Sequence, residues 1–198
     1  MNDPHTYPTP HIVRETSRGI SLVDIKDEMF ANREIECVGV IDAKMTYALC
    51  QQLRYLQRED PDGRITMYFN SPGGEVDSGL AIYDVMQAIT CPVRTVCLGM
   101  AASMASLLFV AGDERDMLPH ARVMIHDPLI SGGLGGSALN IKAVSDGLMR
   151  TRQIIAEVIA HHSGHSVEEV LEVTAHDAYF EAPEAVAWGL ADRIVERL

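Results

Sequence analysis

From about Glu34 to the end of the chain, hydrophobic and polar residues follow two different patterns, one typical of strands and one typical of helices. Short apolar runs with many β-branched residues are typical of strands, whereas apolar residues three or four positions apart, such as Leu49, Leu53 and Leu56, indicate a helix with one buried face. These patterns predict strands at 34–41, 64–69, 93–98 and 122–125, and helices at 45–57, 79–89, 103–111, 138–161 and 182–188. The alternation predicts an α/β fold of repeated βα units, with a largely parallel sheet and helices on its faces.

The segment 138–161 is the longest helix that the pattern predicts, and at 1.5 Å per residue it is about 36 Å long. Its apolar residues lie close to one face; they are Ile141, Val144, Leu148, Ile155, Val158 and Ile159. A helix of this length after the sheet is expected to project from the body, so that its apolar stripe needs a partner, most simply a second copy of the chain. A helix folded back on its own sheet explains the same periodicity, and Gly147 is a candidate kink.

Composition adds limits on class and partners. A chain of 198 residues with 47% hydrophobic residues is most simply one domain with a full core. The formal net charge of -12, without a local basic run, argues against nucleic acid and anionic membrane surfaces as partners. The four cysteines form no Cys-x-x-Cys pair and stand in or beside apolar segments. We therefore expect buried free thiols in a reducing compartment, with neither disulfides nor a zinc site.

The N-terminal segment 1–20 is polar and rich in proline, and it lacks the charged start and apolar core of a secretory signal. Such a composition buries little surface, so the segment is predicted to be a mobile extension before a single domain at 21–198. The most hydrophobic run, around 101–111, is about half the ~20 residues that cross a bilayer. A cytoplasmic protein is the expectation.

Ser103 stands where the strand predicted at 93–98 passes, through very small residues around Gly99, into the helix predicted at 103–111. Backbone N–H groups at a helix N-terminus favour developing negative charge, which suits a nucleophile and its oxyanion. The same position suits an ordinary helix cap, a role that serine often takes. This stretch alone leaves both roles open.

Two glycine-containing loops punctuate the pattern. The first, 70–75, follows a predicted strand and is expected at the carboxyl edge of the sheet, where α/β folds place their sites. Its adjacent glycines let backbone N–H groups approach a substrate oxygen, although an ordinary Pro-Gly turn explains the same residues. The second, 131–137, precedes the long helix. No Walker motif or G-x-G-x-x-G fingerprint is present, so the chain itself is not expected to bind ATP.

A serine nucleophile needs a general base, usually a histidine whose tautomer is held by a carboxylate. His126 ends the strand predicted at 122–125 and should emerge at the same sheet edge as Ser103, which makes it the candidate base. The sequence leaves the carboxylate open among Asp177, Asp127 and Asp192.

Three further histidines, His161, His162 and His165, lie near the end of the long predicted helix. Gly164 breaks the helix between them, and no His-Glu-x-x-His pattern is present. A solvated helix end is therefore favoured over a set of metal ligands.

Four segments carry a resemblance to a known family. They are Asn70-Ser-Pro-Gly-Gly74, Gly99-Met-Ala-Ala-Ser-Met104, Arg122-Val-Met-Ile-His126 and Ala182-Pro-Glu-Ala-Val-Ala-Trp-Gly-Leu-Ala-Asp192. In kind, order and spacing they resemble the ClpP family, the proteolytic subunits of ATP-dependent Clp serine proteases, from about Thr9 to the C-terminus. The resemblance implies the ClpP/crotonase fold, with Ser103 as nucleophile and His126 as base. It implies Asp177 as the orienting carboxylate and the amides of Gly74 and Met104 as the oxyanion hole.

The resemblance also implies an assembly. The segment at about 127–162 matches the projecting handle that interlocks two seven-membered rings around a closed chamber, and the chain before Glu34 is similar to the axial loops at its entrance. Unfolded polypeptides would be delivered by a Clp-type AAA+ unfoldase, which uses the ATP, so that this chain needs no cofactor. The same superfamily contains crotonases that act on acyl-CoA thioesters, and an inactive ring partner of an active paralogue is a further alternative.

Three features depart from the family pattern. Asp127 stands where the family usually has glutamine, His176 where it usually has arginine, and two residues are missing around 112–115. The arginine is tied to contacts between rings. If His176 replaces it in an ion pair, ring pairing should weaken as histidine loses its charge near neutral pH, which sedimentation at mildly acidic and alkaline pH would measure.

Overall fold

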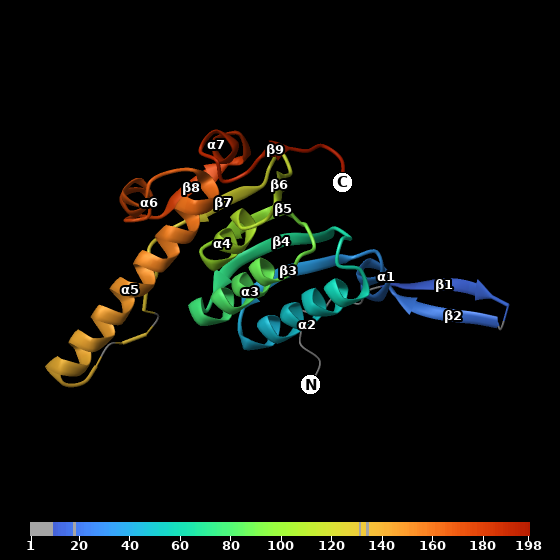
Figure 1. Cartoon of the computed structure of the whole chain (residues 1–198), viewed down its shortest axis with the longest axis horizontal. Coiled ribbons are helices and arrows are strands. Elements are labelled where there is room, and N and C mark those ends of the chain that lie inside the picture. Colours follow the sequence, from blue (N-terminus) through green and yellow to red (C-terminus); the bar gives the residue numbers. More distant parts are fainter. Residues whose placement is uncertain (1–9, 18, 131, 134) are drawn as a thin grey trace.

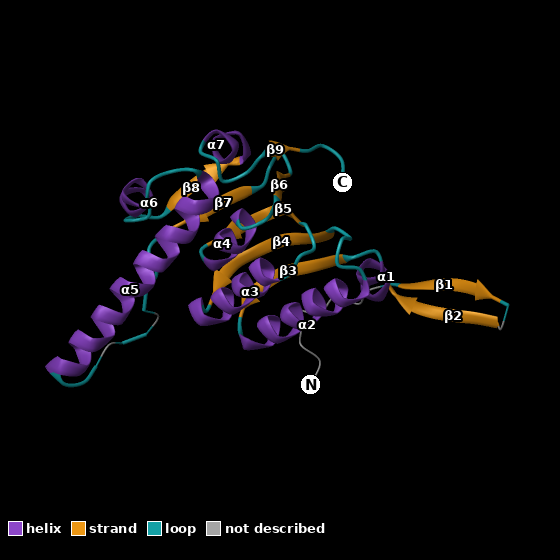
Figure 2. Ribbon diagram, viewed as in Figure 1, coloured by secondary structure: helices purple, strands orange, loops and turns teal. Residues whose placement is uncertain are grey.

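The structure, a computed structural model, describes residues 10–17, 19–130, 132–133 and 135–198. Within these residues seven strands form one sheet, whose main path β3-β4-β5-β6-β9 is parallel throughout (Figure 2). β7 pairs in parallel with the end of β5, and β8 adds antiparallel to β7. The strands are β3 (Glu34–Ile41), β4 (Ile65–Gly74), β5 (Val93–Ala102), β6 (Glu114–Met117), β7 (Arg122–Ile125), β8 (Ala178–Glu181) and β9 (Arg193–Ile194). The α/β fold with a largely parallel sheet is confirmed.

Helices cover the sheet and extend from it. Figure 1 shows α2 and α3 side by side over β3 and β4, and α4 contacts α3, β4 and β5. The helices are α1 (Ile25–Ala31), α2 (Ala43–Glu59), α3 (Val76–Ala88), α4 (Met104–Val110), α5 (Ala138–Ser163), α6 (Val167–Val173) and α7 (Ala182–Ala187). Leu49, Leu53 and Leu56 of α2 are buried, as the spacing predicted. α2 starts two residues early because the side chain of Asp42 caps its first turn.

The prediction of a loop at 70–75 was wrong for most of its length, because β4 continues through Gly74. Pairing with two neighbours holds this segment extended: Ile41 of β3 aligns with Gly74, and Ala101 of β5 aligns with Ser71. A register shift in each pairing accommodates the proline and the glycines. Tertiary pairing has therefore overridden the local turn signal.

Several short elements have no counterpart among the predicted ones, namely α1, α6, β6, β8, β9 and an N-terminal hairpin. β6 shows why, since its sequence Glu-Arg-Asp-Met has no apolar alternation. Ion pairs and pairing to β5 and β9 hold it in the sheet.

The segment 1–20 was predicted to be a mobile extension. Residues 1–9 and 18 lie outside the described residues. The rest of the segment contributes to an antiparallel hairpin of β1 (His11–Thr16) and β2 (Gly19–Asp24), which the sequence pattern did not predict. The first four residues of β2 are exposed, so the hairpin buries little surface within one chain.

α5 projects beyond the sheet rather than folding back along it (Figure 1). Its buried residues all lie in the C-terminal third, Ile155, Ala156, Ile159 and Ala160, whereas the Leu139 side chain near its start is 81% exposed. The predicted apolar stripe is thus covered within one chain only at its end. Among the described residues no helix is long and apolar enough to cross a membrane.

The carboxylate of Asp116 on β6 is fully buried between two arginines. Arg94 lies 2.6 Å from Oδ2 and Arg193 lies 2.7 Å from Oδ1. Removing one member of a buried ion pair leaves the other charge without compensation, so Asp116→Ala should lower the free energy of unfolding by about 3–5 kcal/mol. Glu114→Ala, which removes an exposed partner of Arg193, should lower it by less than about 1 kcal/mol. Urea denaturation of both variants measures the difference, and equal losses would contradict the prediction.

Candidate active site

Ser103 occupies the junction between β5 and α4, as the strand-turn-helix pattern predicted. Its φ of 54° and ψ of -125° lie in a region that residues with a Cβ rarely adopt. Hydrogen bonds at both ends hold this backbone. Its N–H donates to Met124 O at 2.9 Å, and its carbonyl accepts from the backbone N–H of Ser106 at 3.0 Å and from Ser106 Oγ at 2.6 Å. The strained turn presents the Ser103 hydroxyl at the carboxyl edge of the sheet.

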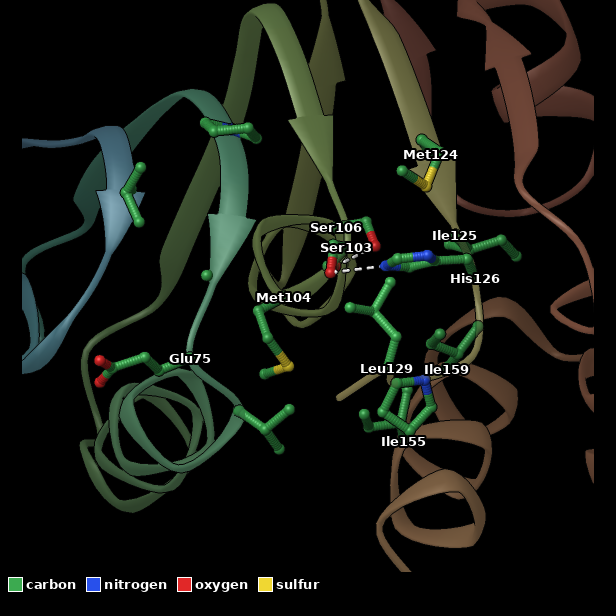
Figure 3. A pocket seen from close by; sticks show the side chains of 15 residues that line it. Glu75, Ser103, Met104, Ser106, Met124, Ile125, His126, Leu129, Ile155 and Ile159 are labelled. Carbon is green, nitrogen blue, oxygen red and sulfur yellow. Dashed lines mark hydrogen bonds between the residues drawn. The ribbon is translucent and has the colours of Figure 1, made fainter. Parts of the chain in front are cut away.

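His126 lies beside this hydroxyl. β7 pairs with the end of β5 so that Met124 aligns with Ala102, which brings the residue after β7 next to Ser103. His126 Nε2 lies 2.9 Å from Ser103 Oγ, and Figure 3 shows the imidazole directed at the hydroxyl. The ring is 15% exposed. This distance is short enough for direct proton transfer.

Asp177 is the carboxylate that reaches the other ring nitrogen. The antiparallel pairing of β7 and β8 aligns Ile125 with Ala178, which places Asp177 beside His126. His126 Nδ1 and Asp177 Oδ1 are 3.2 Å apart, and the carboxylate is 62% exposed. The other two candidates lie elsewhere: Asp127 pairs with Arg152 and Asp192 with Arg115. Ser103, His126 and Asp177 therefore form one continuous chain of contacts.

The glycine segment of β4 packs directly against the turn that carries Ser103. Gly73 has a φ of +92°, and a Cβ there would lie 2.7 Å from Ser103 Cβ and 2.6 Å from Ala102 O. Gly74 and Met104 line the same cavity as Ser103 and His126. The two residues predicted for an oxyanion hole therefore line the cavity that holds the Ser103 hydroxyl, and their role stays a prediction.

This cavity has a volume of about 560 Å³ and a mostly apolar wall. Figure 3 shows Leu129, Ile155 and Ile159 opposite Met104, below the Ser103–His126 pair. The sequence placed Ile155 and Ile159 in an apolar stripe that faces either a partner or the chain's own sheet, and it did not predict their place beside the site. Their helical spacing carried no signal that could separate the two roles.

The family model described as Clp protease matches residues 17–198. The chain belongs to the Clp protease family. That membership makes it a Clp-type peptidase, from a family whose members generally form oligomeric rings that work with unfoldases. The resemblance inferred from the four sequence segments is confirmed.

Gly73 of this Clp protease lies so close to Ser103 that a single added carbon at position 73 should have a large effect on activity. Gly73→Ala should lower kcat/KM for peptide hydrolysis by about 100-fold or more, because its Cβ overlaps the Ser103 turn and displaces the Ser103 hydroxyl. Gln57→Ala, near the opposite end of β5 from Ser103, should leave kcat/KM unchanged. Peptide hydrolysis and melting temperature of both variants measure the effect. Near wild-type activity of Gly73→Ala would show that the glycine is dispensable.

The histidines at the end of α5 are less solvated than expected. His162 Nε2 lies 3.3 Å from the Tyr83 hydroxyl, and burial, with His161 nearby, lowers the pKa of His162. His165 stacks on Trp188 with ring centroids 4.1 Å apart. Gly164, in the left-handed conformation, ends α5 as predicted. Within the part of the chain that the structure describes, no three His, Cys, Asp or Glu residues converge as metal ligands.

All four cysteines are free thiols. Cys37, Cys91 and Cys97 are buried and Cys50 is half-buried. Burial raises the pKa of the Cys37 and Cys97 thiols to about 12, so both stay protonated and unreactive at neutral pH.

Proposed function

We propose that this Clp protease chain is a serine endopeptidase subunit that uses Ser103 as nucleophile, His126 as general base and Asp177 to orient the base. The observation that carries the proposal is the pair of contacts on one imidazole, 2.9 Å from Ser103 Oγ to Nε2 and 3.2 Å from Nδ1 to Asp177 Oδ1. A hydroxyl, an imidazole and a carboxylate in this order are what a serine nucleophile requires.

The reaction proceeds in two steps. His126 Nε2 takes the proton from Ser103 Oγ as the oxygen bonds to the peptide carbonyl carbon, and the backbone N–H groups of Gly74 and Met104 receive the oxyanion. The tetrahedral intermediate then breaks its C–N bond, and His126 gives the proton to the leaving amine. Water, deprotonated by His126, hydrolyses the resulting ester. The chemistry uses no metal or cofactor from this chain.

The setting of this reaction is a closed chamber of two stacked seven-membered rings. The projecting, exposed half of α5 supports the assembly, because Leu139, Ile141 and Met149 there are left exposed by a single chain. Unfolded polypeptides would enter from an AAA+ unfoldase that consumes the ATP. The apolar wall of Leu129, Ile155 and Ile159 favours apolar side chains beside the scissile bond.

Labelling with a fluorophosphonate, followed by mapping of the adduct, tests the proposed nucleophile. We expect labelling at Ser103 that is lost in His126→Ala. An unlabelled protein that hydrates enoyl-CoA would support the crotonase alternative, and one that neither labels nor turns over peptide would support an inactive ring partner. Either outcome would overturn the proposal.

A further inference from the structure

Asp127, the residue after the proposed base, is held by three hydrogen bonds. Its backbone N–H donates to Thr174 O at 2.8 Å, and its Oδ1 accepts from Thr174 Oγ1 at 3.0 Å. Its Oδ2 accepts from Arg152 Nε at 2.5 Å. Both carboxylate oxygens are thus engaged, one by the residue that ends α6 and the other by a residue of α5.

Arg152 extends the same connection. Its Nη2 donates to Leu171 O at 2.7 Å in the last turn of α6, so one guanidinium joins α5, α6 and the chain beyond β7. The side chains of Arg152 and Asp127 are 24% and 33% exposed, and Thr174 is buried. An ion pair that is largely shielded from water and shares hydrogen bonds at both ends holds its geometry better than an exposed pair.

These contacts clamp the turn that carries Asp177. Thr174, three residues before Asp177, is fixed to Asp127, and Ala178, directly after it, is paired with Ile125. The turn between them has no helix or strand of its own. Because the Asp177 carboxylate is 62% exposed, packing does little to place it, and the two anchors of the turn set its distance to His126.

We infer that Asp127 and Arg152 form a positioning pair that holds Asp177 against His126, an inference that rests on the proposed function. Neither residue lines the cavity, and neither contacts Ser103. The inferred route is the His126–Asp177 contact, and the Asp177→Asn background described below separates it from a direct effect on His126, the chain neighbour of Asp127.

The test is a double-mutant cycle on the assembled full-length protein, read as the second-order rate of fluorophosphonate labelling. Asp127→Asn and Arg152→Met should each lower the rate about 10- to 100-fold, the range expected when a reacting group is misplaced by about 1 Å. Arg152→Lys keeps the charge without the bond to Leu171 and should give an intermediate rate. Arg122→Met, which breaks an exposed pair between β7 and β8, is the matched control and should label like wild type.

The decisive comparison uses the Asp177→Asn background. If the pair acts through Asp177, adding Asp127→Asn there should lower the rate by less than about twofold, because the contact it supports is already lost. A full additional loss would assign Asp127 a general structural role and overturn the inference, as would wild-type rates in both single variants. Melting temperatures identify any variant that fails to fold. If Asp127→Asn or Arg152→Met fails to fold, Arg152→Lys takes its place in the comparison.

The two proposals fail in different ways. A wild-type protein that is not labelled at Ser103 would overturn the proposed function and the positioning role with it. A labelled wild type whose Asp127 and Arg152 variants label equally fast would overturn the positioning role alone.

Discussion

Ser103→Ala should abolish peptide hydrolysis, with kcat falling on the order of 10⁴- to 10⁶-fold, because no other group can form the ester intermediate. His126→Ala should lose about as much, and the double variant little more, since the two residues act as one unit. Hydrolysis of a fluorogenic peptide with an apolar side chain before the scissile bond measures kcat. The melting temperature should stay close to that of wild type.

Gln57→Ala is the control for this experiment. Gln57 accepts the Thr90 N–H just before the start of β5, whereas Ser103 follows the other end of that strand, so its loss should lower stability by about 1 kcal/mol and leave kcat unchanged. If Ser103→Ala retained a substantial part of the wild-type rate, the hydroxyl would not be the nucleophile, and the 2.9 Å contact with His126 would need another explanation.

Asp177→Asn should lower kcat by about 10²- to 10⁴-fold with little change in KM. An asparagine can present its amide to His126 Nδ1 and so favour the wrong tautomer, and it does not stabilise the imidazolium that forms during attack. We expect the lower part of this range, because the carboxylate is 62% exposed and water can take over part of its role.

Asp192→Asn separates this effect from a general loss of negative charge. Asp192 forms its ion pair with Arg115, away from His126, so this variant should keep the wild-type kcat. Equal rates for Asp177→Asn and wild type would contradict the orienting role, and they would also remove the basis for a positioning pair at Asp127 and Arg152.

The sequence was most informative where local and tertiary preferences agree. The strands at 34–41 and 122–125 were predicted with the bounds that the structure has, because each is a short apolar run that ends at a strong stop signal. Their ends matter for chemistry, since the pairing of β7 with β5 is what brings His126 to Ser103. Two of the three proposed catalytic residues therefore followed from pattern and topology.

The other features of the site could not be predicted, because they depend on contacts with residues that lie far away in the chain. Residue spacing could not choose among three aspartates, because the choice depends on the antiparallel pairing of β8, a four-residue strand without a clear signal. The glycines at 73 and 74 read as a turn in isolation and became strand only through contact with β3 and β5. Likewise, nothing local shows that Arg152, 25 positions after Asp127, lies within 2.5 Å of it.

The backbone conformation of Ser103 lowers the stability of the fold at the position where the proposed chemistry takes place. A positive φ at a residue with a Cβ is disfavoured by about 1–3 kcal/mol, and glycine would relieve that strain. A glycine at position 103 would therefore give a more stable chain that lacks the proposed nucleophile. Selection for stability alone would therefore favour the loss of the Ser103 hydroxyl, and its retention would have to come from selection for activity.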